Sequence, residues 1–253
     1  DTWARDHGAI SLLDAESPLL LDFCFNGWGM KFAANYDNLI TRNLFKAGLF
    51  KGRYMNCLDY VLEGGSIESD GKGTLLTTSE CLLSDNRNDK MNRVEVATYL
   101  RSKLHVQRVL WLDYGYLSGD DTDSHVDTLA RFCPNDTIVY VQCCNKEDEH
   151  YEALRRMEDQ LLTFRTLDDR PYRLLPLPMA DTIMNNDERL PATYANFLVI
   201  NGAVLYPTYN QPGNDMKAAD ILTLAFPDRE IIGIDCRTLI KQHGSLHCVT
   251  MQY

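Results

Sequence analysis

A strand, a helix and a second strand follow one another three times in this chain of 253 residues. This repetition constrains the fold more than any other feature. Each first strand is rich in β-branched or aromatic residues and follows a turn residue. The predicted first strands are 74–78, 137–141 and 203–206, and the second strands are 108–112, 172–175 and 230–234. The predicted apolar helix faces are Val94, Ala97, Leu100 and Leu104; Tyr151, Leu154, Met157 and Leu161; and Ala218, Ile221, Leu222 and Ala225.

The spacing of these units is nearly constant. Thr74 and Thr137 are 63 positions apart, and Thr137 and Ala203 are 66 apart. A period of this size predicts supersecondary units that stack or are arranged radially. The alternative is a plain α/β sandwich with accidental regularity. No linker or low-complexity segment divides the chain, so we expect residues 1–253 to form a single domain of the α/β class.

Composition narrows the range of partners and compartments. A net charge of −11 argues against nucleic acid, because few cations are available to replace phosphate counterions, and it suits a small cationic partner. The eight cysteines show neither zinc-like spacing nor a disulfide framework, so we expect free thiols in a reducing, cytoplasmic compartment. No apolar run approaches the roughly 20 residues of a membrane span, so no membrane association is expected.

Two motifs contain the residue types of a nucleophilic site. Cys248 follows Gly244-Ser245, which allows a tight turn to present the sulfur at the start of an element, predicted to be a strand. Far upstream, His125 and Asp127 are two residues apart, so in an extended segment both side chains would point to one face. A buried structural cysteine is the simpler reading of Cys248 taken alone. The acidic run Asp121, Asp123, His125 and Asp127 could instead bind a divalent metal or form a solvated turn.

Two further segments add groups that can hold a flat cation. Trp3-Ala4-Arg5-Asp6 offers an indole face and a carboxylate, although core packing of Trp3 and an Arg5–Asp6 ion pair are simpler readings. Glu63 precedes Gly64-Gly65, where glycines allow close backbone approach.

Together these motifs resemble the guanidine-modifying superfamily, in particular agmatine deiminase and the Porphyromonas-type bacterial peptidylarginine deiminases. The ending His247-Cys248-Val249-Thr250-Met251-Gln252 is similar to that of the family, whereas Ser124 stands where the family usually has glycine. The resemblance implies a pseudo-fivefold α/β propeller of the pentein type with the active site on its axis. Because the family has most of a module before Trp-x-Arg-Asp, we expect this chain to lack an N-terminal module. The resemblance also makes a homodimer plausible.

The resemblance assigns expected roles to individual residues of a catalytic domain. Cys248 would be the nucleophile, with its pKa lowered by a bound cation and a protonated histidine, and His125 the general acid and base. Asp6 and Asp127 would accept hydrogen bonds from the guanidinium, and Glu63 would orient His125 or contact the substrate. Trp3 would cover the substrate, and Asn196 is a weaker candidate for lining the pocket.

The remaining histidines have no expected role. His247 would point away from the site if its segment is extended, and His7, His105, His150 and His243 would lie on the surface or in turns. No metal or organic cofactor is expected.

The identity of the substrate depends on its far end. A carboxylate there, as in arginine or a C-terminal peptidylarginine, would require arginine or lysine at the pocket mouth. No arginine occurs between Arg5 and Arg42, although Lys31 is present, and 25–30 supplies aromatic and neutral polar residues. The expected reaction is therefore hydrolysis of agmatine to N-carbamoylputrescine and ammonia, as in polyamine biosynthesis. Peptidylarginine deiminase, amidinotransferase and a non-catalytic guanidine or polyamine binder are the alternatives.

Overall fold

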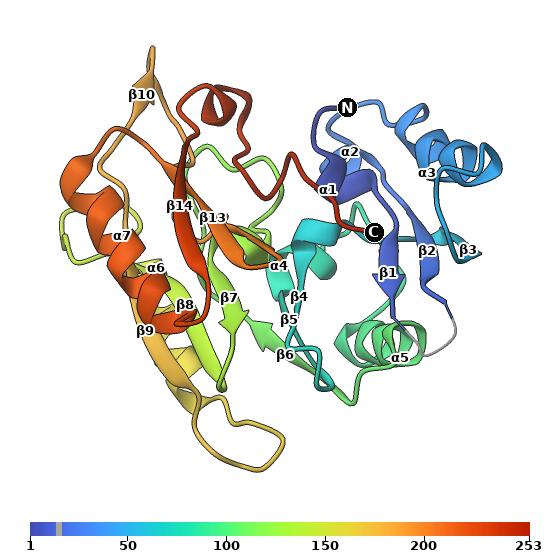
Figure 1. Cartoon of the computed structure of the whole chain (residues 1–253), viewed down its shortest axis with the longest axis horizontal. Coiled ribbons are helices and arrows are strands. Elements are labelled where there is room, and N and C mark those ends of the chain that lie inside the picture. The colour runs from blue at the N-terminus through green and yellow to red at the C-terminus, as the bar shows by residue number, and fades with distance from the viewer. Residues whose placement is uncertain (14–16) are drawn as a thin grey trace.

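The computed structural model describes residues 1–13 and 17–253, and its described part is built from four similar modules (Figure 1). Each module has a short strand, a central strand antiparallel to it, a helix, and a third strand parallel to the central one. The first module contains β1 (Ile10–Leu12), β2 (Leu19–Cys24), α3 (Asp37–Lys46) and β3 (Arg53–Val61). The second contains β4 (Ile67–Ser69), β5 (Thr74–Thr78), α5 (Arg93–Leu104) and β6 (Arg108–Leu112).

The third and fourth modules repeat this order. The third contains β7 (Ala130–Cys133), β8 (Thr137–Gln142), α6 (Tyr151–Thr163) and β9 (Arg173–Pro178). The fourth contains β12 (Leu198–Ile200), β13 (Ala203–Thr208), α7 (Pro212–Ala225) and β14 (Glu230–Asp235). A small hairpin, β10 (Met184–Asn185) with β11 (Glu188–Arg189), lies between them. The mixed α/β class and all three predicted strand–helix–strand units are thus confirmed.

Short helical elements connect the modules and supply most of the site. They are α1 (Ala4–His7), α2 (Gly27–Met30), α4 (Ser79–Leu82), η1 (Gly64–Ser66), η2 (Val126–Thr128) and η3 (Leu239–Gln242). α2 is a turn rather than a regular helix, because Trp28 and Gly29 have φ of 56° and 81°. In Figure 1 the red C-terminal segment returns to the blue α1, and the Arg5 amide donates to the Cys248 carbonyl at 3.1 Å.

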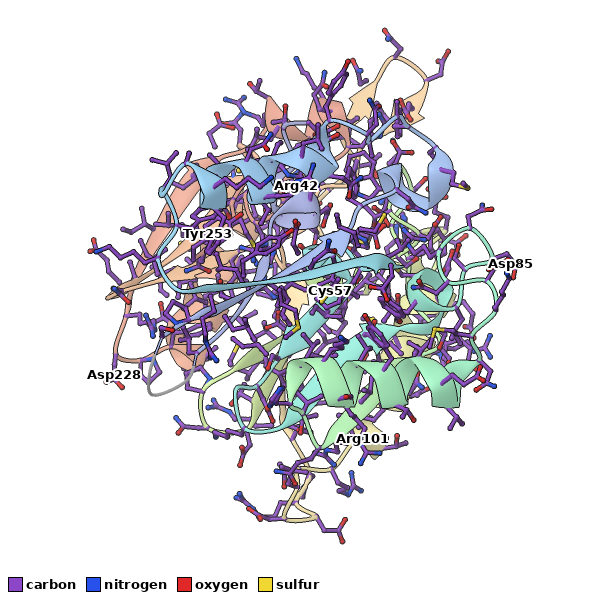
Figure 2. All side chains as sticks on the ribbon, turned by 90° about the vertical axis from the view of Figure 1, so that its right-hand side faces the viewer. Arg42, Cys57, Asp85, Arg101, Asp228 and Tyr253 are labelled. Atoms are coloured by element: carbon purple, nitrogen blue, oxygen red, sulfur yellow. The ribbon has the colours of Figure 1, made fainter. Side chains whose placement is uncertain are left out.

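The helices cover the sheets with their apolar faces. Leu154, Met157 and Leu161 of α6 are buried as predicted, as are Ala218, Leu222 and Ala225 of α7. The predicted face of α5 is wrong at Val94, which is 73% exposed, because Val96 takes its place beside Leu100 and Leu104. Asn92 caps this helix together with Glu95, and this fixes its first turn. Figure 2 shows α5 on the outside of its module, with Arg101 facing outward. Cys57 of the neighbouring β3 is fully buried.

Two apolar cores support the modules, and a small aromatic cluster lies at the site. One core joins the third and fourth modules, and a second joins the first and second. The third cluster consists of Trp3, Phe25, Trp28, Ala34 and Cys248. All eight cysteines are free thiols. Among the described helices, none has the length and apolar character needed to cross a membrane.

Candidate active site

A cavity of about 340 Å³ opens where the two ends of the described chain meet the loops between modules. Its walls are formed by residues far apart in the sequence: Asp1, Trp3, Asp6, Trp28, Phe32, Asp121, Thr122, Lys241, Gln242, His243, Gly244 and Cys248. A thiol, three aspartates and two indoles therefore share one pocket.

Cys248 lies in a turn over 246–249 and not at a strand start, which corrects the predicted local structure. The Asn196 side chain holds the centre of this turn. The Asn196 Oδ1 atom accepts from the backbone amides of His247 and Cys248 at 2.9 and 3.3 Å, and it lies 3.4 Å from Cys248 Sγ. Gly244 permits the turn to pass Trp3, since a Cβ atom there would lie 2.6 Å from the indole ring.

The environment of Cys248 differs from the expected one. Burial, followed by the charges of Asp127 and Asp6, raises the pKa of its thiol well above the usual value. The predicted lowering applies when a cation is bound and a histidine is protonated, so it stays a prediction; the charged groups that act on the thiol here are the two carboxylates. A cation between Asp6 and Asp127 would remove much of this repulsion.

Asp6 and Asp127 converge on the same side of Gly65. A Cβ atom on Gly65 would lie 2.9 Å from Asp6 Oδ1 and 3.1 Å from Asp127 Oδ2. Asp6 accepts from the Trp28 indole at 2.9 Å and from the Gly65 amide at 3.0 Å. Burial and mutual repulsion raise the pKa of Asp6 to about 8, and burial raises that of Asp127 to about 7. Two buried carboxylates this close favour a cation between them.

Asp127 is held from one side only. Its Oδ2 atom accepts from Asn196 Nδ2 at 3.2 Å and contacts His247 Nδ1 at 2.7 Å, while Oδ1 has no partner among the described residues. The prediction that His247 points away is wrong, because its segment is a turn and its ring lies beneath Asp127. The second ring nitrogen of His247 lies 3.3 Å from Arg131 Nη2.

His125 is buried beside the carboxylates. It precedes the 3₁₀ turn η2 rather than lying in an extended segment, which corrects the predicted geometry of the His-x-Asp motif. Its Nδ1 atom is 3.6 Å from Asp6 Oδ1, and its Nε2 atom has no hydrogen-bond partner among the described residues. Burial and the charges of Arg87 and Lys31 lower the pKa of the imidazole well below its usual value. A neutral imidazole with a free nitrogen can take a proton from a neighbouring group.

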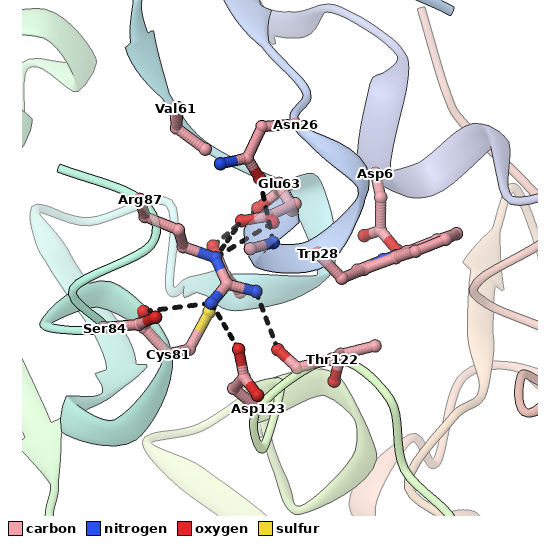
Figure 3. Close-up of polar contacts among 12 residues, drawn as sticks. Asp6, Asn26, Trp28, Val61, Glu63, Cys81, Ser84, Arg87, Thr122 and Asp123 are labelled. Carbon is pink, nitrogen blue, oxygen red and sulfur yellow. Dashed lines mark hydrogen bonds and ion pairs between the residues drawn. The ribbon is translucent and has the colours of Figure 1, made fainter. Parts of the chain in front are cut away.

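Glu63 lies behind this site and does not line the cavity. Both of its carboxylate oxygens accept from Arg87 Nε at 3.0 Å (Figure 3). Among the described residues, Glu63, Cys81 and His125 are the only set close enough together to share a metal ion, and Arg87 already supplies a cation to this position. The acidic run does not converge on a metal site, since Asp123 pairs with Lys31 and Arg87 while Asp127 pairs with His247.

His7 was wrongly expected on the surface or in a turn, since it lies in α1 and is 8% exposed. His150 does lie in a turn, where it is 1% exposed and bound to Asp148. His105 does lie in a turn, in the left-handed conformation that ends α5. His243 has the same conformation at the cavity wall, and its Nδ1 atom contacts the Gly119 carbonyl at 2.8 Å.

Sequence reasoning missed the roles of Trp28 and Arg87. Trp28 lines the cavity and donates to Asp6, and its only sequence signal is the pair of flanking glycines that accompany a left-handed backbone. Arg87 lies in an irregular loop between α4 and α5 and gave no signal. Trp3 and Asn196 do lie at the site, Trp3 on the cavity wall and Asn196 beneath Cys248.

Comparisons with known proteins agree with this arrangement. A family model described as Porphyromonas-type peptidyl-arginine deiminase matches residues 1–253. A solved Porphyromonas gingivalis structure, provisionally named an arginine deiminase, is 58% identical with a TM-score of 0.97, covering 100% of this chain and 75% of that one. A cysteine-to-serine variant of C. jejuni agmatine deiminase, solved with substrate bound, is 40% identical with a TM-score of 0.89, covering 98% and 72%.

A curated relative extends the comparison beyond solved structures. A Listeria monocytogenes protein, provisionally named agmatine deiminase 2, is 32% identical over 274 residues, which cover 99% of this chain and 73% of that protein.

Proposed function

Because this chain belongs to the Porphyromonas-type peptidyl-arginine deiminase family, we propose that it hydrolyses the guanidinium group of agmatine to N-carbamoylputrescine and ammonia. One observation carries the proposal: the Cys248 thiol and Asp6 line one small cavity, and the neutral imidazole of His125 and a second carboxylate of raised pKa, Asp127, lie buried beside Asp6 around Gly65. The described part of the chain has no lysine or arginine salt bridge to either carboxylate, so a substrate cation can provide that charge.

Binding comes first in the proposed mechanism. The guanidinium lies between Asp6 and Asp127 and donates paired hydrogen bonds to them, the geometry that makes such pairs strong. The indoles of Trp3 and Trp28 cover the cation and the aliphatic chain. The bound positive charge reverses the effect of the carboxylates on Cys248, so the thiol ionises when substrate is present.

The covalent steps then balance as follows. The thiol proton passes to His125 while Cys248 Sγ bonds to the guanidinium carbon. His125 returns the proton to the departing nitrogen, the C–N bond breaks and ammonia leaves, which gives an amidino-thioether. Water then adds to the same carbon and gives a proton to His125. As the C–S bond breaks, the proton of the added hydroxyl passes to the sulfur, which restores the thiol and releases the neutral ureido product. His125 gives its remaining proton to solvent, where ammonia takes it up as ammonium.

The cavity mouth supports agmatine by its charges. Lys31 is engaged by the Asp121 carbonyl and the Asp123 carboxylate, both at 2.6 Å. The carboxylate of Asp121 lies on the cavity wall and has only His243, at 3.8 Å, as an ion-pair neighbour among the described residues. The ammonium group at the far end of agmatine can therefore form an ion pair with the Asp121 carboxylate.

A second candidate is favoured by Lys241, which also lines the cavity. A lysine at the mouth could bind the carboxylate of free arginine or of a C-terminal peptidylarginine. The same site would then catalyse deimination of arginine to citrulline. The fivefold propeller also stays a proposal, supported by the four similar modules.

The test measures ammonia released from agmatine, arginine and a C-terminal peptidylarginine in separate assays. Agmatine is expected to give the highest kcat/KM, and Cys248→Ala is expected to abolish turnover while still binding agmatine by calorimetry. Faster ammonia release from the peptide would overturn the assignment of agmatine as the substrate, and turnover by Cys248→Ala would overturn the assignment of Cys248 as the nucleophile. Binding without consumption by the unaltered protein would indicate a non-catalytic binder, and amidino transfer to an added amine would indicate an amidinotransferase.

A further inference from the structure

A buried arginine behind the cavity connects the segments that carry the proposed acid–base group. The Arg87 side chain is 0% exposed and does not line the cavity. Figure 3 shows its guanidinium at the centre of a ring of acceptors. Nε donates to both oxygens of Glu63 at 3.0 Å, Nη1 to Asp123 Oδ2 at 2.7 Å, and Nη2 to the Thr122 carbonyl at 2.9 Å.

These acceptors belong to two different segments. Glu63 immediately precedes η1, whose Gly65 lies against His125 and donates to Asp6. Thr122 and Asp123 belong to the loop that leads into His125. In that loop, Asp123 and Ser124 have φ of 62° and 63°, a conformation that L-residues hold only when the surroundings impose it.

The charged and titratable groups that face His125 come from several elements. They are Asp6 on α1, Lys31, Glu63 before η1, Cys81 on α4, Arg87 after it, Asp127 on η2 and His247 in the C-terminal turn. Of these, the cations Arg87 and Lys31 oppose protonation of the ring. Arg87 therefore influences both where the imidazole lies and whether it carries a proton.

We propose that Arg87 is the positioning residue of this site, which holds Glu63 and the 122–124 loop together so that His125 faces the carboxylates in a single orientation. The proposal rests on the proposed function of His125 as the acid–base group. The proposal requires arginine rather than lysine at this position. The planar guanidinium directs its N–H groups to the Glu63 carboxylate, the Asp123 carboxylate and the Thr122 carbonyl at the same time.

The test uses Arg87→Lys, which keeps the charge and removes the fork. We expect kcat for agmatine to fall about 10- to 100-fold, as for a displacement of the order of 1 Å, with KM within about threefold. In protein with ¹⁵N-labelled histidine, the ring signals of His125, assigned by their loss in His125→Asn, should move and broaden. Arg155→Lys, at an exposed arginine paired with Asp159, is the control and should change neither.

A second variant covers the case in which Arg87→Lys does not fold. The double variant Glu63→Gln/Arg87→Met removes both charges of the buried pair and should therefore fold. It should show the same loss of kcat, because nothing then holds the 122–124 loop to residue 63. Wild-type kcat and unchanged His125 signals in either variant would overturn the proposal. So would a lower Tm with unchanged His125 signals, since that result means a purely structural role. The spectra do not depend on turnover, so they test the positioning role of Arg87 even if the protein hydrolyses no guanidine.

Discussion

At the scale of single residues, the site depends on hydrogen bonds that fix side chains whose charges oppose one another. Asp6 is fully enclosed, and its two oxygens accept from Trp28 and Gly65. These bonds favour the ionised carboxylate, while burial and Asp127 disfavour it more strongly. The backbone of Trp28 is left-handed, which costs a bulky residue roughly 1–2 kcal/mol. Backbone strain of this kind is usually retained at positions where the side chain has a functional role.

Trp28→Phe tests the task of the indole N–H while keeping an aromatic ring. Loss of one donor to a buried carboxylate should cost about 1–3 kcal/mol, or roughly 10- to 100-fold in kcat/KM for agmatine. Since the bond lowers the pKa of Asp6, the acid limb of the pH profile should move to higher pH. Trp111→Phe, at a buried indole of β6, is the matched control. An unchanged profile in Trp28→Phe would mean that the indole only packs.

Residue types at the site were predictable, but their contacts were not. The motifs of Cys248, His125 and Asp127 were visible because they combine reactive groups with turn residues, whereas Asp6 was assigned through the resemblance of Trp3-Ala4-Arg5-Asp6 to the family. His247 was misplaced because its orientation depends on a turn that Asn196 fixes from 51 positions away. No local pattern records such a hydrogen bond.

At the scale of elements, glycines in short turns allow the side chains of the site to lie close together. Gly65 lies in the middle of η1, where a Cβ atom would be 2.6 Å from His125 Nδ1 and within 3.1 Å of both carboxylates. Because Gly65 has no side chain, the His125 imidazole and the two carboxylates can pack directly against the backbone of η1.

Gly65→Ala is expected to displace His125 and to lower kcat/KM about 100-fold or more, because small misplacements of catalytic groups are costly. Gly213→Ala is the control, since Gly213 lies in the first turn of α7 with no atom within 4 Å of an added Cβ. That variant should keep full activity and gain slightly in Tm, as helical glycine-to-alanine changes do. Equal activity of the two variants would show that η1 has room to move.

The elements themselves followed from local sequence where the pattern was strong. The predicted strands 74–78 and 108–112 coincide with β5 and β6. The first module was missed, because β3 carries polar residues on exposed positions and β2 contains the buried Asp22, which accepts from Tyr54. The short antiparallel strands were also missed, since three or four residues give too little alternation to detect.

At the scale of the whole molecule, the cavity is assembled from loops of several modules and from both ends of the described chain. Such a site carries a thermodynamic cost, because charged groups are gathered away from water before any ligand compensates them. Asp127 shows this cost clearly, since its pKa is raised to about 7 by burial. A carboxyl whose pKa is higher in the folded than in the unfolded protein binds its proton more tightly when folded. Its contribution to stability is complete below the unfolded value and is lost as pH rises through about 7.

Asp127→Asn should therefore stabilise the protein in a pH-dependent way while abolishing turnover. The amide oxygen can still accept from Asn196 and His247, and the amide nitrogen takes the position of the unpartnered Oδ1. One pKa unit corresponds to about 1.4 kcal/mol, so the gain should be near zero at about pH 4 and on the order of a few kcal/mol at about pH 8.

Urea unfolding of both proteins across this range measures the difference. The lowered pKa of His125 reduces stability at acid pH in both proteins and largely cancels. His247 contacts Asp127, so its contribution differs between the two proteins, but its lowered pKa confines that difference to acid pH, below the rise expected through about pH 7. Asp228→Asn, at an exposed carboxylate (Figure 2), should give a small difference at every pH. A gain for Asp127→Asn that does not grow with pH would show that Asp127 does not carry the electrostatic cost on which the proposed cation site depends.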